Sequence, residues 1–229
     1  MAELTAEQLE TLRQIPSPAI ANAIETFDVM PRNKGFMLPQ IKSIFPDMPH
    51  MIGYAVTAVI GAEMPPSKNM NVSRLDWVDA ITSVPEPRVL VMKDIDYPNV
   101  VGSFWGEVQA NIHKALGCVG TITDGGVRDL DEMRELGFNA FATDVLVSHA
   151  YVHLIEVGVP VTVGGMDVKM GDIVLGDQHG VVGIPMDIAA ELPAAVKRVE
   201  DREQVMIGMC QAPDFTVEKL KDQLRSMYG

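Results

Sequence analysis

The stretch from Trp105 to Asp129 constrains the fold of this chain more than any other. It reads as a glycine turn that opens a helix, the helix itself, a short apolar strand, and a second turn that ends in Arg128 and Asp129. A strand that runs antiparallel to the helix before it returns the chain to its starting point, so the two turns are expected to lie side by side. The sequence therefore predicts that Glu107, in the first turn, shares a pocket with Arg128 and Asp129, although residues 108–127 separate them.

These side chains indicate a particular chemistry. Two carboxylates and one guanidinium at neighbouring turns suit a hard divalent cation together with an anionic substrate. Carboxylates without His or Cys beside them favour Mg²⁺ or Mn²⁺ over zinc. Plainer roles stay open for both acids. Asp129 is also a favoured N-cap for the helix expected after it, and Glu107 is also favourable in the first turn of a helix because of the helix dipole.

The segment resembles the RraA-like family, which includes pyruvate-specific class II aldolases acting on 4-hydroxy-4-methyl-2-oxoglutarate and 4-carboxy-4-hydroxy-2-oxoadipate. The family's enzymes carry an acid in a Gly-Asp turn, followed at this same spacing by a D-G-x-x-R-D turn. This chain has Gly106-Glu107 and then Asp124-Gly125-Gly126-Val127-Arg128-Asp129, so its first turn carries Glu in place of Asp. The resemblance extends more weakly from Gly53 to Pro185.

The resemblance implies roles for the residues of the two turns. In the enzymes that it points to, the residue at the position of Asp129 binds the divalent cation, and the residue at Arg128 contacts oxygen atoms of the substrate. The implied reaction is a retro-aldol cleavage of a 4-hydroxy-2-oxo acid to pyruvate, with decarboxylation of oxaloacetate as a side activity through the same enolate. Arg128 suits the developing oxyanion because its donors are forked, and the N–H groups from Gly106 to Val108 suit the substrate carboxylate.

Two glutamates have more than one candidate role. Glu107 has three candidate roles: it binds the metal through water, orients the water that acts as base, or caps its helix. The resembling aldolases also recruit a C-terminal glutamate from the neighbouring subunit into the outer shell of the metal. Glu203 fits that pattern best, although a solvated helix face is the favoured structural explanation for it. The resemblance further implies that the chain assembles into a homotrimer or a hexamer.

An alternative function comes from the same family, because other members are non-catalytic regulators that bind and inhibit an RNA-degrading endonuclease. Retention of both acids and the arginine favours the enzyme, since a pure binding module has no need of a metal site. The methyltransferase label attached to some relatives lacks support here. The chain contains neither a G-x-G-x-x-G nor a Walker A motif that would bind a nucleotide.

Other polar side chains receive structural interpretations. Asp124 is interpreted as a turn residue, His179 as part of a hairpin turn, and His113 as solvated or paired. Lys93 and Lys114 are the candidates for a Schiff-base aldolase, but nothing in the sequence around them indicates the burial that such a lysine requires.

The order of elements predicts an α/β layered domain with a mixed sheet and helical ends. Runs of apolar and β-branched residues predict strands at 53–61, 85–94 and 118–123, followed by β-hairpins towards residue 185. Helices are expected after a capping box at Thr5, from an N-cap at Ser17 to Ile24, and at 75–81, 187–209 and 215–227.

We interpret residues 1–229 as one domain with a helical N-terminal segment (1–52), an α/β core (53–185) and C-terminal helices (186–229). The family resemblance implies that this core is a swivelling β/β/α sandwich.

Charge and cysteine content narrow the partners and the compartment. A formal net charge of −13 argues against a nucleic-acid partner, which needs a basic surface, and leaves a small 2-oxo acid as the expected one. Cys118 and Cys210 form neither a disulfide framework nor a metal-ligand pair, which favours the reducing cytoplasm. The N-terminus is acidic where a signal peptide is basic, and no apolar run is long enough to span a membrane.

Overall fold

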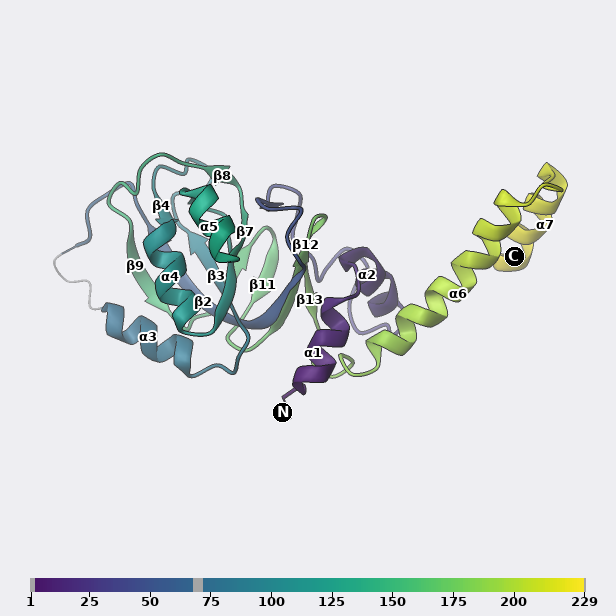
Figure 1. Cartoon of the computed structure of the whole chain (residues 1–229), viewed down its shortest axis with the longest axis horizontal. Coiled ribbons are helices and arrows are strands. Elements are labelled where there is room, and N and C mark those ends of the chain that lie inside the picture. Colours follow the sequence, from purple (N-terminus) through teal and green to yellow (C-terminus); the bar gives the residue numbers. More distant parts are fainter. Residues whose placement is uncertain (1–2, 68–71, 229) are drawn as a thin grey trace.

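A mixed β-sheet forms the centre of the computed structural model, which describes residues 3–67 and 72–228 (Figure 1). Its strands follow the order β1-β7-β5-β3-β2-β12-β13, and β9 pairs with the second half of β2. The central strands β7, β5, β3 and β2 are parallel to one another, and the outer strands join them antiparallel. Their bounds are β1 Lys42–Ser43, β2 Met51–Gly61, β3 Arg88–Asp94, β5 Cys118–Thr123, β7 Asn139–Ala142, β9 His153–Val157, β12 Ile173–Asp177 and β13 Gly180–Ile184.

Both faces of this sheet are covered, because its central strands are apolar on both sides. Along β2, Tyr54 and Val56 face one core while Met51 and Ala55 face the other, which is the period of two that a strand imposes. The first core also receives side chains from α3 (Arg74–Thr82), α4 (Glu107–Ala115) and α5 (Leu130–Leu136). The hairpin of β10 (Val161–Val163) and β11 (Met166–Val168) packs on the second. The predicted strands therefore appear as β2, β3 and β5.

A second, three-stranded parallel sheet positions the candidate site. In it, β4 (Ser103–Trp105) pairs with β6 (Gly126–Val127), and β6 pairs with β8 (Asp144–Val145). Because β4 and β6 are parallel, the helices that follow them, α4 and α5, both begin at the same edge of the small sheet. The Arg128 N–H donates to the Trp105 carbonyl at 3.1 Å, so the two turns expected from the sequence are adjacent.

The two N-terminal helices pack beside the end of the main sheet. The capping box at Thr5 is present and begins α1 (Ala6–Arg13), as predicted. The N-cap of α2 (Ser17–Glu25) is Pro16, so the prediction that Ser17 caps this helix is wrong. Instead, the Ser17 hydroxyl and N–H donate to the two carboxylate oxygens of buried Asp177, at 2.8 and 2.7 Å. A buried carboxylate needs such donors, and this long-range pairing takes the serine away from the cap.

The C-terminal helices extend away from the sheet. Helix α6 (Leu192–Gln211) begins five residues later than predicted, because residues 187–191 form turns, and α7 (Val217–Tyr228) follows it. Buried side chains of α6 end at Val199, and no side chain among residues 200–226 is buried. Figure 1 shows the outer half of α6 projecting from the body together with α7. Within the described residues, no helix is both long and apolar enough to cross a bilayer.

Candidate active site

The candidate site forms where the turn after β4 meets the turn after β6. The N-cap residue of α4 is Gly106, which has no side chain to accept from the helix. The carboxylate of Asp129 takes that place, since its Oδ2 accepts the N–H of Glu107 at 3.0 Å. Arg128 lies beside it, with Nε 3.8 Å from the same Oδ2. The structure therefore brings together Asp129, Arg128 and the first turn of α4.

The close approach of these turns requires glycine at position 106. A Cβ on Gly106 would lie 2.5 Å from Asp129 Oδ2 and 3.2 Å from Arg128 Cγ, both tighter than an ordinary van der Waals contact. The φ of this residue is −173°, an extended conformation that any residue adopts, so space and not backbone geometry selects glycine here.

Asp129 does not cap the helix that follows it in the chain. It occupies the N-cap position of α5 with a left-handed backbone (φ 52°, ψ 53°), yet its side chain accepts no hydrogen bond from that helix. Such a conformation is uncommon for a residue other than glycine, although Asp and Asn tolerate it best. The sequence interpretation of Asp129 as a helix cap is thus correct, but the helix that it caps is α4 and not α5. Its other oxygen, Oδ1, accepts no hydrogen bond from the described part of the chain.

Arg128 and Asp129 line a surface pocket of about 360 Å³ together with Gly106, Val108, Arg74 and His149. Arg74 comes from the first turn of α3, and its guanidinium forms no ion pair or hydrogen bond with any described residue. Two guanidinium groups thus face one carboxylate, so the pocket is locally positive in a chain whose formal net charge is −13. Such a pocket suits an anionic ligand.

Sequence reasoning missed Arg74 and His149. The only signal for Arg74 was the capping box of Ser73 and Asp76, which places the arginine at the start of a helix without showing which pocket it faces. His149 lies in the loop before β9, with Nδ1 2.7 Å from the Ala150 carbonyl. Nothing in the local sequence places either residue beside Arg128.

Comparison with known proteins fits this geometry. A family model described as RraA-like (Aldolase/RraA) matches residues 19–182. The chain belongs to the RraA-like family. The match includes β4, α4, β6 and α5, the elements that build the pocket.

Curated relatives of this RraA-like chain are distant. An uncharacterized protein from Methanocaldococcus jannaschii is 27% identical over 138 residues, which are 59% of this chain and 66% of that protein. A protein from Halalkalibacterium halodurans, provisionally named a 4-hydroxy-4-methyl-2-oxoglutarate aldolase, is 31% identical over 81 residues, or 35% of this chain and 39% of that protein. The chain spans less than two thirds of the length of these relatives.

Solved structures confirm the expected RraA-like fold, with its mixed sheet and terminal helices. An uncharacterized protein from Pseudomonas syringae pv. tomato superposes with a TM-score of 0.73 at 22% identity, covering 99% of this chain and 96% of that one. Streptomyces coelicolor RraAS2, described as an unusual member of the RNase ES inhibitor RraA protein family, gives a TM-score of 0.68 at 22% identity, covering 89% and 98%. At these identities the likeness concerns the fold.

The two predicted glutamates of this RraA-like chain lie outside the pocket. The Glu107 side chain is exposed and forms no hydrogen bond or ion pair with any described residue, while its backbone N–H bonds to Asp129. Glu203 lies on α6, where it accepts a hydrogen bond from the Asn22 amide at 3.5 Å. Figure 1 shows α6 and α4 on opposite sides of the body, so Glu203 does not reach the pocket of its own chain.

Asp124, Lys93 and His113 also differ in detail from their sequence interpretations. Asp124 is more than a turn residue: it is buried and accepts from Lys93 Nζ at 2.5 Å and from the Asp94 N–H at 2.7 Å. Lys93 is thereby paired, and the exposed Lys114 Nζ donates to the Leu136 carbonyl at 2.6 Å, so neither lysine supports the Schiff-base reading. His113 is paired but not solvated, since it is buried against Trp77.

The donor set of the pocket bears on the expected metal. The described residues contain no group of three or more His, Cys, Asp or Glu side chains arranged to hold a metal ion. Magnesium is commonly bound by only one or two carboxylates, with water and substrate oxygens completing its shell. Asp129 Oδ1, a carboxylate oxygen without a protein donor in the described chain, fits that mode.

Proposed function

We propose that this protein is a divalent-metal-dependent lyase that cleaves a 4-hydroxy-2-oxo acid to pyruvate by a retro-aldol reaction. The observation that carries the proposal is the convergence of Arg128, Arg74 and the free oxygen of Asp129 on one pocket at the start of α4. The provisional aldolase name of the Halalkalibacterium relative agrees with this reading.

The start of α4 is suited to the carboxylate of a 2-oxo acid. The first N–H groups of a helix have no acceptor within it, and they carry the positive end of the helix dipole. Asp129 already uses the Glu107 N–H, so the N–H groups of Val108 and Gln109 are the ones that remain for a ligand. Both residues line the pocket. The Glu107 N–H is therefore not available at the carboxylate site expected over residues 106–108, and the Gln109 N–H is an additional donor there.

Arg128, which lines the pocket, would bind the keto oxygen, where negative charge develops as the C3–C4 bond breaks. Its guanidinium offers forked donors, and preorganised donors at a developing oxyanion are among the strongest contributions to catalysis. Arg74, free of any partner in the described chain, would orient the rest of an anionic substrate. When bound, Mg²⁺ or Mn²⁺ would supply Lewis-acid polarisation of the keto group, and Asp129 Oδ1 is the oxygen that would hold it.

The active assembly that we propose is a trimer or hexamer in which Glu203 of a neighbouring chain approaches this pocket. The outer half of α6 projects from the body together with α7 and offers a surface to a neighbouring chain, which supports the idea (Figure 1). Light scattering is expected to give a trimeric or hexameric mass. A monomer with full turnover would rule out any role for Glu203 across subunits.

Pyruvate release from a panel of 4-hydroxy-2-oxo acids and oxaloacetate tests the function directly. We expect release with Mg²⁺, its loss in excess chelator, and its recovery when Mg²⁺ is restored. Arg128→Lys is expected to fold normally and to lose roughly 10²–10³ in kcat, because the forked donors are gone. Arg198→Lys, an exposed change on α6, is the matched control. A protein that releases no pyruvate from any compound at saturating Mg²⁺ is not this lyase.

A further inference from the structure

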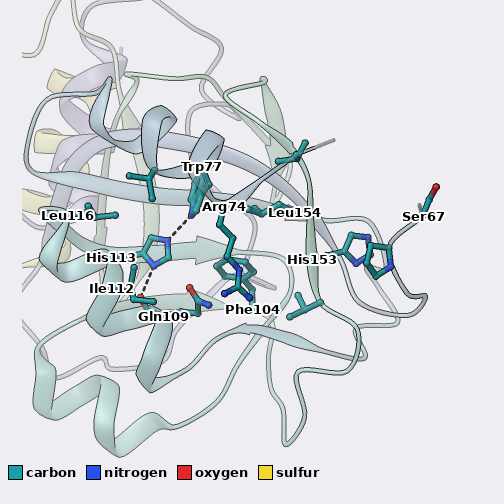
Figure 2. A pocket seen from close by; sticks show the side chains of 14 residues that line it. Ser67, Arg74, Trp77, Phe104, Gln109, Ile112, His113, Leu116, His153 and Leu154 are labelled. Carbon is teal, nitrogen blue, oxygen red and sulfur yellow. Dashed lines mark hydrogen bonds between the residues drawn. The ribbon is translucent and has the colours of Figure 1, made fainter. Parts of the chain in front are cut away.

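A second cavity of about 440 Å³ opens beside the proposed active site (Figure 2). The two cavities share part of their lining, namely Arg74, Phe104, Gln109 and Val152. Beyond this common boundary the second cavity is mainly apolar and aromatic, with Trp77, Ile112, Leu116 and Leu154 among its walls. The chain thus has an apolar chamber that adjoins a positively charged one across a shared wall.

The ring nitrogens of His113 and Trp77, which are buried in the wall of this chamber, already have hydrogen-bond partners. His113 Nε2 accepts from Trp77 Nε1–H at 2.7 Å, and its Nδ1–H donates to the Gln109 carbonyl at 2.6 Å. Burial lowers the pKa of His113 to about 4, so its ring is neutral at pH 7. Neither nitrogen is free for a ligand, and the ring packs edge-on against Trp105 with centroids 4.9 Å apart. His113 therefore presents an uncharged aromatic surface.

The charge at the chamber is confined to its boundary. Among the described lining residues Arg74 is the only one with a permanent charge, and Figure 2 shows its side chain running towards Phe104 and Gln109, which belong to both cavities. A carboxylate held deep between Trp77, Leu116 and Leu154 would lose its hydration without gaining a partner, which is strongly unfavourable. An apolar group in the same place would be stabilised.

We propose that this chamber binds the C4 substituent of the substrate, and that the substituent is apolar and about the size of an aromatic ring. The inference rests on the proposed lyase function. In the reaction the C3–C4 bond breaks, its electron pair passes to the pyruvate enolate, the 4-hydroxyl proton leaves to a base, and C3 of the enolate is reprotonated. The products are pyruvate and an apolar aldehyde, benzaldehyde when the substituent is phenyl.

Three substrates that differ only at C4 test the proposal: 4-hydroxy-2-oxopentanoate (methyl), 4-hydroxy-2-oxo-4-phenylbutanoate (phenyl) and 4-hydroxy-2-oxoadipate (carboxymethyl). We expect kcat/KM for pyruvate release to be about 10- to 100-fold higher for phenyl than for methyl, as burial of an aromatic side chain predicts. The kcat/KM of the carboxymethyl compound is expected to be well below that of the phenyl compound. A preference for carboxymethyl, or equal values for phenyl and methyl, would overturn the proposal.

Ile112→Asp probes the chamber wall. Ile112 is 46% exposed and lines only the apolar chamber, so a charge there is compatible with folding. We expect the phenyl-to-methyl ratio of kcat/KM to fall about tenfold. Leu75→Asp is the matched control, because Leu75 is 75% exposed and lines neither cavity. An unchanged ratio in Ile112→Asp, or an equal fall in Leu75→Asp, would count against the chamber.

A binding measurement separates failure of the chamber from failure of the lyase. The compounds 2-oxo-4-phenylbutanoate and 2-oxopentanoate lack the 4-hydroxyl group and cannot undergo the cleavage, so calorimetric titration reports their affinity alone. The phenyl compound is expected to bind about 10- to 100-fold more tightly, and Ile112→Asp is expected to remove most of that difference. If the protein shows this binding preference but cleaves none of the substrates, the result supports the apolar site and contradicts the lyase function. Equal affinities would overturn the chamber even if pyruvate is released.

Discussion

The carboxylate of Asp129 accepts the backbone N–H of Glu107, 22 residues earlier in the chain, at 3.0 Å. One aspartate therefore closes the N-terminus of α4 with Oδ2 and leaves Oδ1 for the pocket. The structural role of Asp129 therefore belongs to Oδ2, and its proposed chemical role belongs to Oδ1. It also explains why Gly106 stands at the cap: a side chain there would occupy the position of the carboxylate.

Substitution of Asp129 can separate these two roles. Asp129→Asn keeps an acceptor for the Glu107 N–H but removes the charge, so we expect nearly unchanged stability together with loss of Mg²⁺ affinity and turnover. Asp129→Ala removes both the acceptor and the charge. We expect it to lose Mg²⁺ affinity and turnover and also about 1 kcal/mol of stability, the usual effect of removing a cap. Chemical denaturation, Mg²⁺ titration and pyruvate release measure the three quantities. Full activity in Asp129→Asn would leave only the capping role.

Gly106→Ala tests how closely the two turns must approach. The new Cβ would lie 2.5 Å from Asp129 Oδ2, so the carboxylate and Arg128 have to move. A displacement of about 1 Å in a reacting group can lower the rate ~10²-fold, and we expect a loss of that order with the fold retained. Gly208→Ala on α6 is the control, since a Cβ there meets no atom of the described chain within 4 Å outside its own stretch of helix. Wild-type rates in Gly106→Ala would show that the two turns can move apart without an effect on catalysis.

Much of this arrangement could be predicted from the sequence, because it follows from local order. The glycine turn, helix, strand and second turn are consecutive, so the return of the chain to Gly106 needs no long-range information. The strands at β2 and β3 were equally readable from their apolar runs. Both are buried on the two faces that such runs predict.

What the sequence could not supply depends on contacts between distant segments. Arg74 reaches the pocket from α3, and the pairing of Ser17 with Asp177 joins residues 160 apart. Neither contact is indicated by a periodic pattern of residues in the sequence. The direction of the Glu107 side chain could not be predicted either. A residue in the first turn of a helix can face the pocket or the solvent at the same sequence separation from Arg128 and Asp129.

Asp94 is expected to make stability depend on pH. It is fully buried, its Oδ2 has no hydrogen-bond partner among the residues that the structure describes, and Oδ1 accepts the Asp96 N–H at 2.9 Å. Burial, together with the nearby negative charges of Asp96 and Asp124, raises its pKa from 3.8 to about 6, against the opposing effects of the hydrogen bond from the Asp96 N–H and of the Lys93 charge. The folded protein therefore holds this proton more tightly than the unfolded chain. The resulting stability is complete below about pH 4 and disappears as the pH rises through 6.

Denaturation curves between pH 4 and pH 7 check this expectation. Asp94→Asn cannot ionise, so its unfolding free energy should lack the decrease of the order of 2 kcal/mol that the wild type shows over this range. Asp222→Asn, an exposed change on α7, is the control and is expected to keep the wild-type slope. Parallel curves for Asp94→Asn and wild type would assign the pH dependence to other groups.

Glu107 is the position at which this chain departs from the family pattern, and its substitution decides whether the acid matters. The side chain is exposed and unpaired within the described residues, yet its backbone is held one residue from the pocket-lining Gly106 and Val108. If the carboxylate serves a bound metal or its water, charge matters more than length, because a small shift of the ion absorbs one methylene. Glu107→Asp is then expected to keep substantial pyruvate release, and Glu107→Gln to lose far more despite its similar shape.

A purely helix-stabilising Glu107 leads to a different result. Both variants would then turn over substrate at nearly the wild-type rate, and Glu107→Gln would lose only about 0.3–1 kcal/mol of stability through the weaker interaction with the helix dipole. Measuring kcat, Mg²⁺ affinity and denaturation for the pair separates the two cases, with Glu132→Gln in the first turn of α5 as a control for the dipole effect alone. Because Asp129 already caps α4, we expect the helix to tolerate either change, so any large kinetic loss in Glu107→Gln reports on the negative charge of the Glu107 carboxylate.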